Sequence, residues 1–167
     1  LPKYRTLNVH PSLLPELRGP APIQNTILGL GEPGITIMRV DEKMDHGPIV
    51  AQARVTLNPW PDHYARVGEK LGRAGGTLLA HIMTEWTMGR LKENPQDEAR
   101  ATYCRLVKKE DGLLDLRDKA EQNLRKVLAY STWPGAHFFF KTKTGRELRV
   151  IVKDAKIEDG KFVLTRV

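Results

Sequence analysis

The sequence contains a single cysteine, Cys104, among its 167 residues. One cysteine excludes an intrachain disulfide framework and a zinc site built from several cysteines. No window approaches the roughly 20 apolar residues that a membrane-spanning helix needs. The first residues also lack a charged-then-apolar export signal. We therefore expect a protein of the reducing cytoplasm that does not associate with membranes.

Metal-binding and phosphate-binding patterns are equally scarce. The five histidines do not form pairs with ligand spacing, so we expect no metal site. Gly29-x-Gly31-x-x-Gly34 has the letters of a dinucleotide-binding loop, but it precedes a predicted strand instead of following one. The histidines are His10, His46, His63, His81 and His137.

Charge, in contrast, is abundant and unevenly distributed. The net charge is +7. Residues 1–100 contain 12 Lys/Arg and 11 Asp/Glu, a balance of +1, whereas residues 101–167 contain 15 and 9, a balance of +6. A basic second half favours contact with a polyanion such as RNA. A basic surface that only contacts solvent is an equally open interpretation of the charge alone.

The first half alternates predicted strands with predicted helices, which indicates an α/β arrangement. Residues 6–9 form a short apolar run, and we expect a buried parallel strand with neighbours on both sides. The other segments with strand periodicity are residues 35–40 and 48–55, and those with helical periodicity are residues 22–28 and 62–88, the latter with a bend or break at Gly75-Gly76.

The second half has a different pattern. A helix over residues 116–130 is followed by short alternating strands, and Thr144-Gly145 and Asp159-Gly160 are typical hairpin turns. This order favours a small, OB-like β-barrel. The predicted strands are residues 137–141, 147–152, 155–158 and 161–166. We divide the chain into an α/β part, residues 1–92, a linker, residues 93–112, and a barrel, residues 113–167, that is incomplete at its end.

Three polar residues at predicted strand ends can form one site. Asn8 and His10 are two residues apart, so they share a face of an extended strand. A neutral imidazole can accept or donate a proton near pH 7, and an amide N–H can stabilise a developing oxyanion. Asp45, after the second strand, can orient His10, stabilise its imidazolium or hold a water. Asn-x-His also occurs by chance, and a structural histidine or a simple turn at Asp45 is the alternative.

Two longer motifs resemble one known family. Asn8 to Gly19 is NVHPSLLPELRG, which closely resembles the N-x-H-x-S-L-L-P-x-x-R-G motif of folate-dependent formyltransferases. Gly34 to Gly47 is GITIMRVDEKMDHG, which resembles the family's G-V-T-I-M-x-M-D-x-x-x-D-x-G. The order and spacing are also those of the family. The resemblance implies part of a Rossmann-like catalytic domain, followed by an OB-like C-terminal domain.

The resemblance also implies roles for individual residues. The formyl donor would be 10-formyltetrahydrofolate. Asn8 would polarise the formyl carbonyl, His10 would manage proton transfer during amine attack, and Asp45 would pair with His10 or position a water. The residues that match the folate-bordering segments are Ser12, Leu13, Leu14, Pro15, Val40, Asp41, Glu42, Lys43 and Met44. Arg18 would be a structural loop residue or a ligand contact, and the candidate RNA-binding residues are Arg18, Lys141, Lys143 and Arg146.

Members of this family differ in the amine that they formylate, which belongs to methionyl-tRNA, glycinamide ribonucleotide or an amino-sugar nucleotide. Arg18 to Gln24, RGPAPIQ, resembles the R-G-A-A-P-I-Q of the methionyl-tRNA type, with Pro20 departing from it. The basic second half favours the same type, with initiator methionyl-tRNA as partner. An amino-sugar nucleotide enzyme is the alternative, because such enzymes can carry a similar extension. A non-catalytic RNA-binding fragment is a further alternative.

The resemblance extends over the whole chain, but the chain matches only part of the length of the family members. Members of the family begin with a nucleotide-binding-like half that supplies part of the folate pocket, and this half has no counterpart here. A closing stretch of the barrel after Val167 is also missing. We therefore expect either a fragment of a longer enzyme or a shortened natural form, and we expect a monomer.

Overall fold

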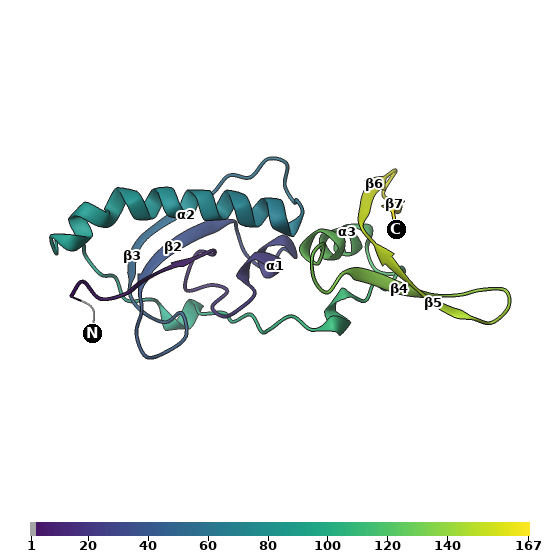
Figure 1. Cartoon of the computed structure of the whole chain (residues 1–167), viewed down its shortest axis with the longest axis horizontal. Helices are drawn as coiled ribbons and strands as arrows, with labels where there is room; N and C mark the ends of the chain where they lie inside the picture. The colour runs from purple at the N-terminus through teal and green to yellow at the C-terminus, as the bar shows by residue number, and fades with distance from the viewer. Residues whose placement is uncertain (1–2) are drawn as a thin grey trace.

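The computed structural model describes residues 3–167, and its first part is a three-stranded sheet covered by a long helix (Figure 1). Strands β1 (Leu7–His10), β2 (Gly34–Arg39) and β3 (Ile49–Arg54) lie in the order β1-β2-β3. Helix α2 (Tyr64–Thr87) runs along one face. The central strand β2 is buried along almost its whole length, so the α/β layering expected from the sequence is present.

The expected direction of the first strand is wrong. Strand β1 pairs antiparallel with β2, and β2 pairs antiparallel with β3. Within the described residues β1 forms the edge of the sheet and is only half-buried. A four-residue apolar run carries no information on strand direction, because that depends on the connection to the partner strand.

Helix α2 is continuous through Gly75-Gly76, where we expected a bend or a break. Gly75 lies against the sheet, and a Cβ at this position would be 2.6 Å from Cγ1 of Val9. The glycine therefore allows close approach of the helix to β1. This contact also holds the strand that ends at His10 against the core.

Two shorter helices connect the two parts of the chain. Helix α1 (Pro22–Ile27) packs against α3 (Ala120–Ala129). Helix α3 begins four residues later than predicted, because the Asp115 side chain accepts from the backbone N–H of Arg117 and closes a turn first. The hydrophobic core around α2 includes Leu128 and Tyr130 from the end of α3. The two parts of the chain thus share one core.

The C-terminal strands form two hairpins. Strand β4 (Ala136–Lys141) pairs with β5 (Glu147–Val152), and β6 (Asp154–Glu158) pairs with β7 (Lys161–Arg166). Both pack on α3 over a small core, and the β4–β5 hairpin projects away from the first sheet (Figure 1). The expected OB-like barrel, incomplete at its end, is not seen in residues 113–167, because the two hairpins remain separate two-stranded sheets. Among residues 3–167, no helix is both long and apolar enough to span a bilayer.

Candidate active site

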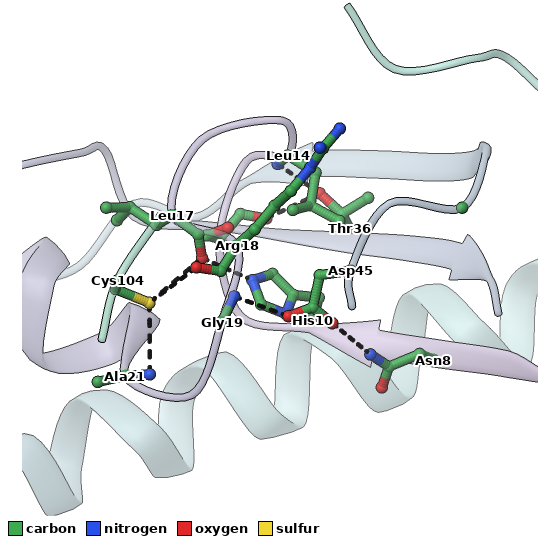
Figure 2. A network of polar contacts seen from close by, with 12 residues as sticks. Asn8, His10, Leu14, Leu17, Arg18, Gly19, Ala21, Thr36, Asp45 and Cys104 are labelled. Atoms are coloured by element: carbon green, nitrogen blue, oxygen red, sulfur yellow. Dashed lines mark hydrogen bonds and ion pairs between the residues drawn. The ribbon is translucent and has the colours of Figure 1, made fainter. Parts of the chain in front are cut away.

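The structure brings Asn8, His10 and Asp45 together (Figure 2). The Asn8 amide Nδ2 donates to Oδ1 of Asp45 at 3.4 Å. Nδ1 of His10 lies 3.6 Å from the same Oδ1 atom. The other carboxylate oxygen, Oδ2, accepts from the backbone N–H of Gly19 at 2.8 Å. One carboxylate therefore joins three segments that are distant in sequence.

The local backbone explains this convergence. Asn8 and His10 alternate with Val9 along β1, so their side chains point to the same face of the sheet. Asp45 lies in the loop after β2, in the left-handed region with φ of 49°. Asp tolerates this conformation better than most residues because its short side chain bonds locally. The loop thereby turns its carboxylate back toward the end of β1.

His10 is held in one orientation and is almost fully buried, with 4% of its surface exposed. Its Nε2 lies 3.0 Å from the Leu17 carbonyl oxygen, which can only accept a hydrogen bond. Nε2 therefore carries the hydrogen in the neutral ring, and Nδ1 holds the free lone pair. Burial lowers the pKa of His10, while the Asp45 carboxylate and the Leu17 bond act in the opposite direction.

This arrangement can perform acid–base chemistry on a carbonyl group. A neutral imidazole with a free Nδ1 lone pair can take a proton, and the Asp45 carboxylate beside it stabilises the imidazolium that forms. The Asn8 amide has two N–H donors and uses one on Asp45, so the second can bind a developing oxyanion. No covalent nucleophile is needed if the attacking group is an amine.

The loop that follows β1 is held by Thr36 in the middle of β2. The Thr36 hydroxyl accepts from Leu14 N–H at 3.0 Å and donates to the Ser12 carbonyl at 2.7 Å. The Gln52 amide of β3 donates to both Thr36 and the Leu14 carbonyl. Thr36 and Gln52 were not predicted as site residues, because strand periodicity shows their face but not their partners.

The nine residues predicted to border the folate do not lie around a single cavity. Val40, Asp41, Glu42 and Lys43 line a cavity of about 790 Å³ beside Arg5, Thr6, Arg39 and His46. Leu13 and Leu14 line a different cavity, of about 690 Å³. Of the three other predicted residues, Ser12 and Pro15 are buried, and Met44 is 69% exposed without lining either cavity. The structure therefore does not bring all nine residues to one pocket.

The structure places Arg18, one of the candidate RNA-binding residues, inside the chain and not on its surface. Its side chain has no exposed surface. The guanidinium donates to the Gln96 amide oxygen, to both carboxylate oxygens of Glu98 and to the Tyr103 hydroxyl. All its donors are thus occupied within the chain, which favours the interpretation as a structural loop arginine.

The other predicted RNA-binding residues lie together and are accessible. Lys141 ends β4, and Lys143 and Arg146 lie in the turn that leads to β5. All three are exposed. Phe139 and Phe140 on the same hairpin are also more than half exposed. The distal end of this hairpin therefore combines positive charge with aromatic surface.

Comparison with known proteins places these features in a family context. The family model described as formyl transferase matches residues 1–83, and the model described as formyl transferase, C-terminal domain, matches residues 106–165. A methionyl-tRNA formyltransferase from Chloroflexus aurantiacus is 42% identical over 164 residues, which is 96% of this chain and 51% of that protein. The chain spans about half the length of the curated relatives it matches.

Solved structures are similar as well. HypX from Aquifex aeolicus, in complex with tetrahydrofolic acid, has a TM-score of 0.72 and 25% identity over 93% of this chain and 26% of that one. The formyltransferase PseJ from Anoxybacillus kamchatkensis was solved in complex with a UDP-linked formamido sugar and tetrahydrofolate. It has a TM-score of 0.57 and 28% identity, and the match covers 62% of this chain and 54% of PseJ. Both complexes contain a folate, and the PseJ complex also contains a sugar nucleotide.

Proposed function

Because the chain belongs to the formyl transferase family, we propose that it carries the catalytic residues and the tRNA-binding part of a methionyl-tRNA formyltransferase. In this proposal the formyl group of 10-formyltetrahydrofolate passes to the amino group of initiator methionyl-tRNA in the cytoplasm. The observation that carries the chemistry is the shared contact of Asn8 and His10 with the Asp45 carboxylate. The identity to a methionyl-tRNA formyltransferase supports the acceptor.

The reaction begins when the amine nitrogen attacks the formyl carbon. A new C–N bond forms, and the carbonyl oxygen becomes an oxyanion that accepts the free N–H of Asn8. His10 Nδ1 takes the proton that the amine loses. The Asp45 carboxylate, 3.6 Å from that nitrogen, offsets the positive charge of the imidazolium.

The tetrahedral intermediate then collapses. The bond between the formyl carbon and the folate nitrogen breaks, and His10 returns its proton to that nitrogen. Tetrahydrofolate and the formylated amine are released, and His10 is neutral again. The lowered pKa of His10 suits this cycle, because the ring must be unprotonated at the start.

The formyl donor would lie along the loop after β2. The cavity lined by Val40, Asp41, Glu42 and Lys43 has about 790 Å³, within the range of small-molecule sites. The tetrahydrofolate complexes of similar structures support a folate as donor.

Residues 113–167 would supply the contact with tRNA, after a catalytic part at 1–92 and a linker at 93–112. The balance of +6 in residues 101–167 favours a phosphate backbone as partner. Exposed Phe139 and Phe140 beside the basic turn are suited to stacking of unpaired bases. An OB-like barrel would arise if further strands paired with the β4–β5 and β6–β7 hairpins.

Transfer to an amino-sugar nucleotide is the second candidate, and the similarity to PseJ favours it. The two candidates are separated by assaying the natural protein that contains this chain. We expect formylation of methionyl-tRNA by 10-formyltetrahydrofolate, with no comparable transfer to glycinamide ribonucleotide or a UDP-linked amino sugar. Preference for the sugar would contradict the proposal, and tRNA binding without turnover would indicate a non-catalytic RNA-binding protein.

Replacement of the three basic residues at the hairpin end tests the RNA contact. We expect the K141A/K143A/R146A variant to bind tRNA more weakly and with a weaker dependence on salt. Each lost phosphate contact should reduce the slope of log K against log [salt] by about 1, so the total change is about 2 to 3. Binding is measured by titration at several salt concentrations.

A matched control uses basic residues outside the hairpin, in α2 and just after it. The Arg73 side chain, in α2, is 80% exposed, and the Arg90 side chain, just after α2, is 63% exposed. Lys92 follows and is also exposed. The R73A/R90A/K92A variant changes the net charge by the same amount. We expect its salt slope to remain that of the unmodified protein, and equal slopes in the two variants would exclude a specific role of the hairpin.

A further inference from the structure

The segment between the two parts of the chain passes directly beside the candidate active site. We call residues 94–104 the linker strap. Its Thr102 carbonyl accepts from Arg18 N–H at 2.9 Å, and Cys104 N–H donates to the Arg18 carbonyl at 2.7 Å. The Thr102 hydroxyl also accepts from Leu17 N–H. The linker strap therefore extends along the loop whose Leu17 carbonyl orients His10.

Arg18 anchors the linker strap through its side chain. A buried guanidinium needs partners for its donors, and here its partners come from the strap and from no catalytic residue. Figure 2 shows that the Arg18 side chain extends away from His10. Its contribution to the site must therefore be indirect.

Gln96 connects this anchor to the loop that carries Asp45. Its amide oxygen accepts from Nε and Nη2 of Arg18 at 3.0 and 2.8 Å. Its amide nitrogen donates to the carbonyl of Asp45 at 2.9 Å and to that of Gly47 at 2.8 Å. The bonds from Arg18 fix which end of the amide faces the loop, because only oxygen can accept from a guanidinium.

The Asp45 loop needs such support. Asp45 has a positive φ, and its side chain must meet Gly19 N–H, Asn8 and His10 at the same time. Within the loop, the Asp41 carboxylate binds His46, and His46 also lies 3.5 Å from Glu98 of the linker strap. Side chains of the strap therefore supply part of the contacts that hold the loop from outside.

We propose that Gln96, oriented by Arg18, is a positioning residue that fixes the Asp45 carboxylate against His10 and Asn8. The segment leading to the proposed tRNA-binding part then determines whether the catalytic carboxylate is in place. The expected effect of Gln96 on catalysis rests on the function proposed above. The expected effect of Gln96 on the position of Asp45 does not. Preorganised groups of this kind are what transition-state stabilisation requires.

The test replaces Gln96 by glutamate. Q96E keeps an oxygen acceptor for Arg18, but it replaces the donor to the Asp45 and Gly47 carbonyls by a second oxygen. We expect the backbone amide of Gly19, which donates to Asp45, to exchange its hydrogen about tenfold faster in NMR measurements. The kcat of formyl transfer should fall by about 10-fold to 100-fold with KM little changed.

Two controls distinguish positioning from general stability. The Val67 amide of α2 bonds to the His63 carbonyl in the core, and its exchange should not change in Q96E. Arg105 is an exposed residue of the linker that pairs with Asp111, so R105A should leave both the Gly19 exchange and kcat unchanged.

Three results would overturn the inference. They are an unchanged Gly19 exchange in Q96E, an equal acceleration at Gly19 and Val67, and an unchanged kcat despite a faster Gly19 exchange. If the unmodified protein does not formylate methionyl-tRNA, the function proposed above fails. The exchange measurement still decides whether Gln96 positions Asp45, because it requires no turnover.

Discussion

Replacement of His10 by glutamine is expected to reduce the kcat of formyl transfer by about 10²-fold to 10⁴-fold. Glutamine can still donate to the Leu17 carbonyl, so it preserves the bond that holds the loop after β1. It cannot take a proton from the attacking amine. Single-turnover kinetics with bound formyl donor measure the chemical step directly.

The pH profile provides a second measurement on the same residue. Burial lowers the pKa of His10 below its ordinary value of 6.5, so the neutral base persists into mildly acidic solution. We expect the rate to fall only as the pH decreases below 6.5 through this lowered pKa. The acidic limb should be absent in H10Q, because no imidazole remains to be protonated.

H10A serves as a comparison that removes the ring and its bond to Leu17 together. If H10Q is as stable as the unmodified protein and inactive, the loss concerns chemistry and not folding. Full activity in H10Q would show that another group accepts the proton. The cavity in H10A should lower the free energy of unfolding, since His10 is buried.

Replacement of Gly47 by alanine is the substitution with the largest expected effect on stability. A Cβ at this position would overlap the carbonyl oxygen of Arg39. The Arg39 backbone cannot easily retreat, because its N–H donates to the Pro48 carbonyl at 3.0 Å and closes the base of the loop. We expect G47A to lose about 3 kcal/mol of unfolding free energy, measured by chemical denaturation.

The same substitution should also reduce activity beyond its effect on stability. The added Cβ would push the loop away from Arg39. This displacement would move the Asp45 carboxylate and the Gly47 carbonyl that Gln96 binds. Activity is measured where G47A is still fully folded. An unchanged kcat there would contradict a requirement for the observed loop conformation.

Gly76 is the matched control for this experiment. It lies on the exposed side of α2, where a Cβ would have no neighbour within 4 Å. Alanine has a higher helix propensity than glycine, so G76A should gain about 0.5 to 1 kcal/mol with unchanged activity. If G47A lowers the free energy of unfolding while G76A raises it, the loss in G47A comes from the contact with Arg39 and not from alanine itself.

Much of the secondary structure could be predicted from local patterns. The alternation in residues 161–166 matches β7, and the long amphipathic pattern matches most of α2. The start of α3 was misplaced because the Asp115 turn uses a side-chain bond that periodicity does not contain. Strand direction and barrel closure were not predictable, since they depend on pairing between distant segments.

In the candidate site, too, some features could be predicted from the sequence and others could not. Asn8, His10 and Asp45 could be found from the sequence, because a strand places alternate residues on one face and the motifs around them are distinctive. The sequence could not reveal which ring nitrogen of His10 is free, since Leu17 decides this through its carbonyl. It also suggested an RNA contact for Arg18, which the structure shows to be buried.

The sequence by itself therefore determined the chemical groups of the site and the family to which they belong. Both depend on residue types at short spacing along the chain. Only the tertiary structure decided how the site is held together. The Gln96 amide lies 51 residues from Asp45 in a segment with no periodic pattern, yet it binds that residue's carbonyl at 2.9 Å. Contacts between such distant polar groups arise from folding and leave no local pattern in the sequence.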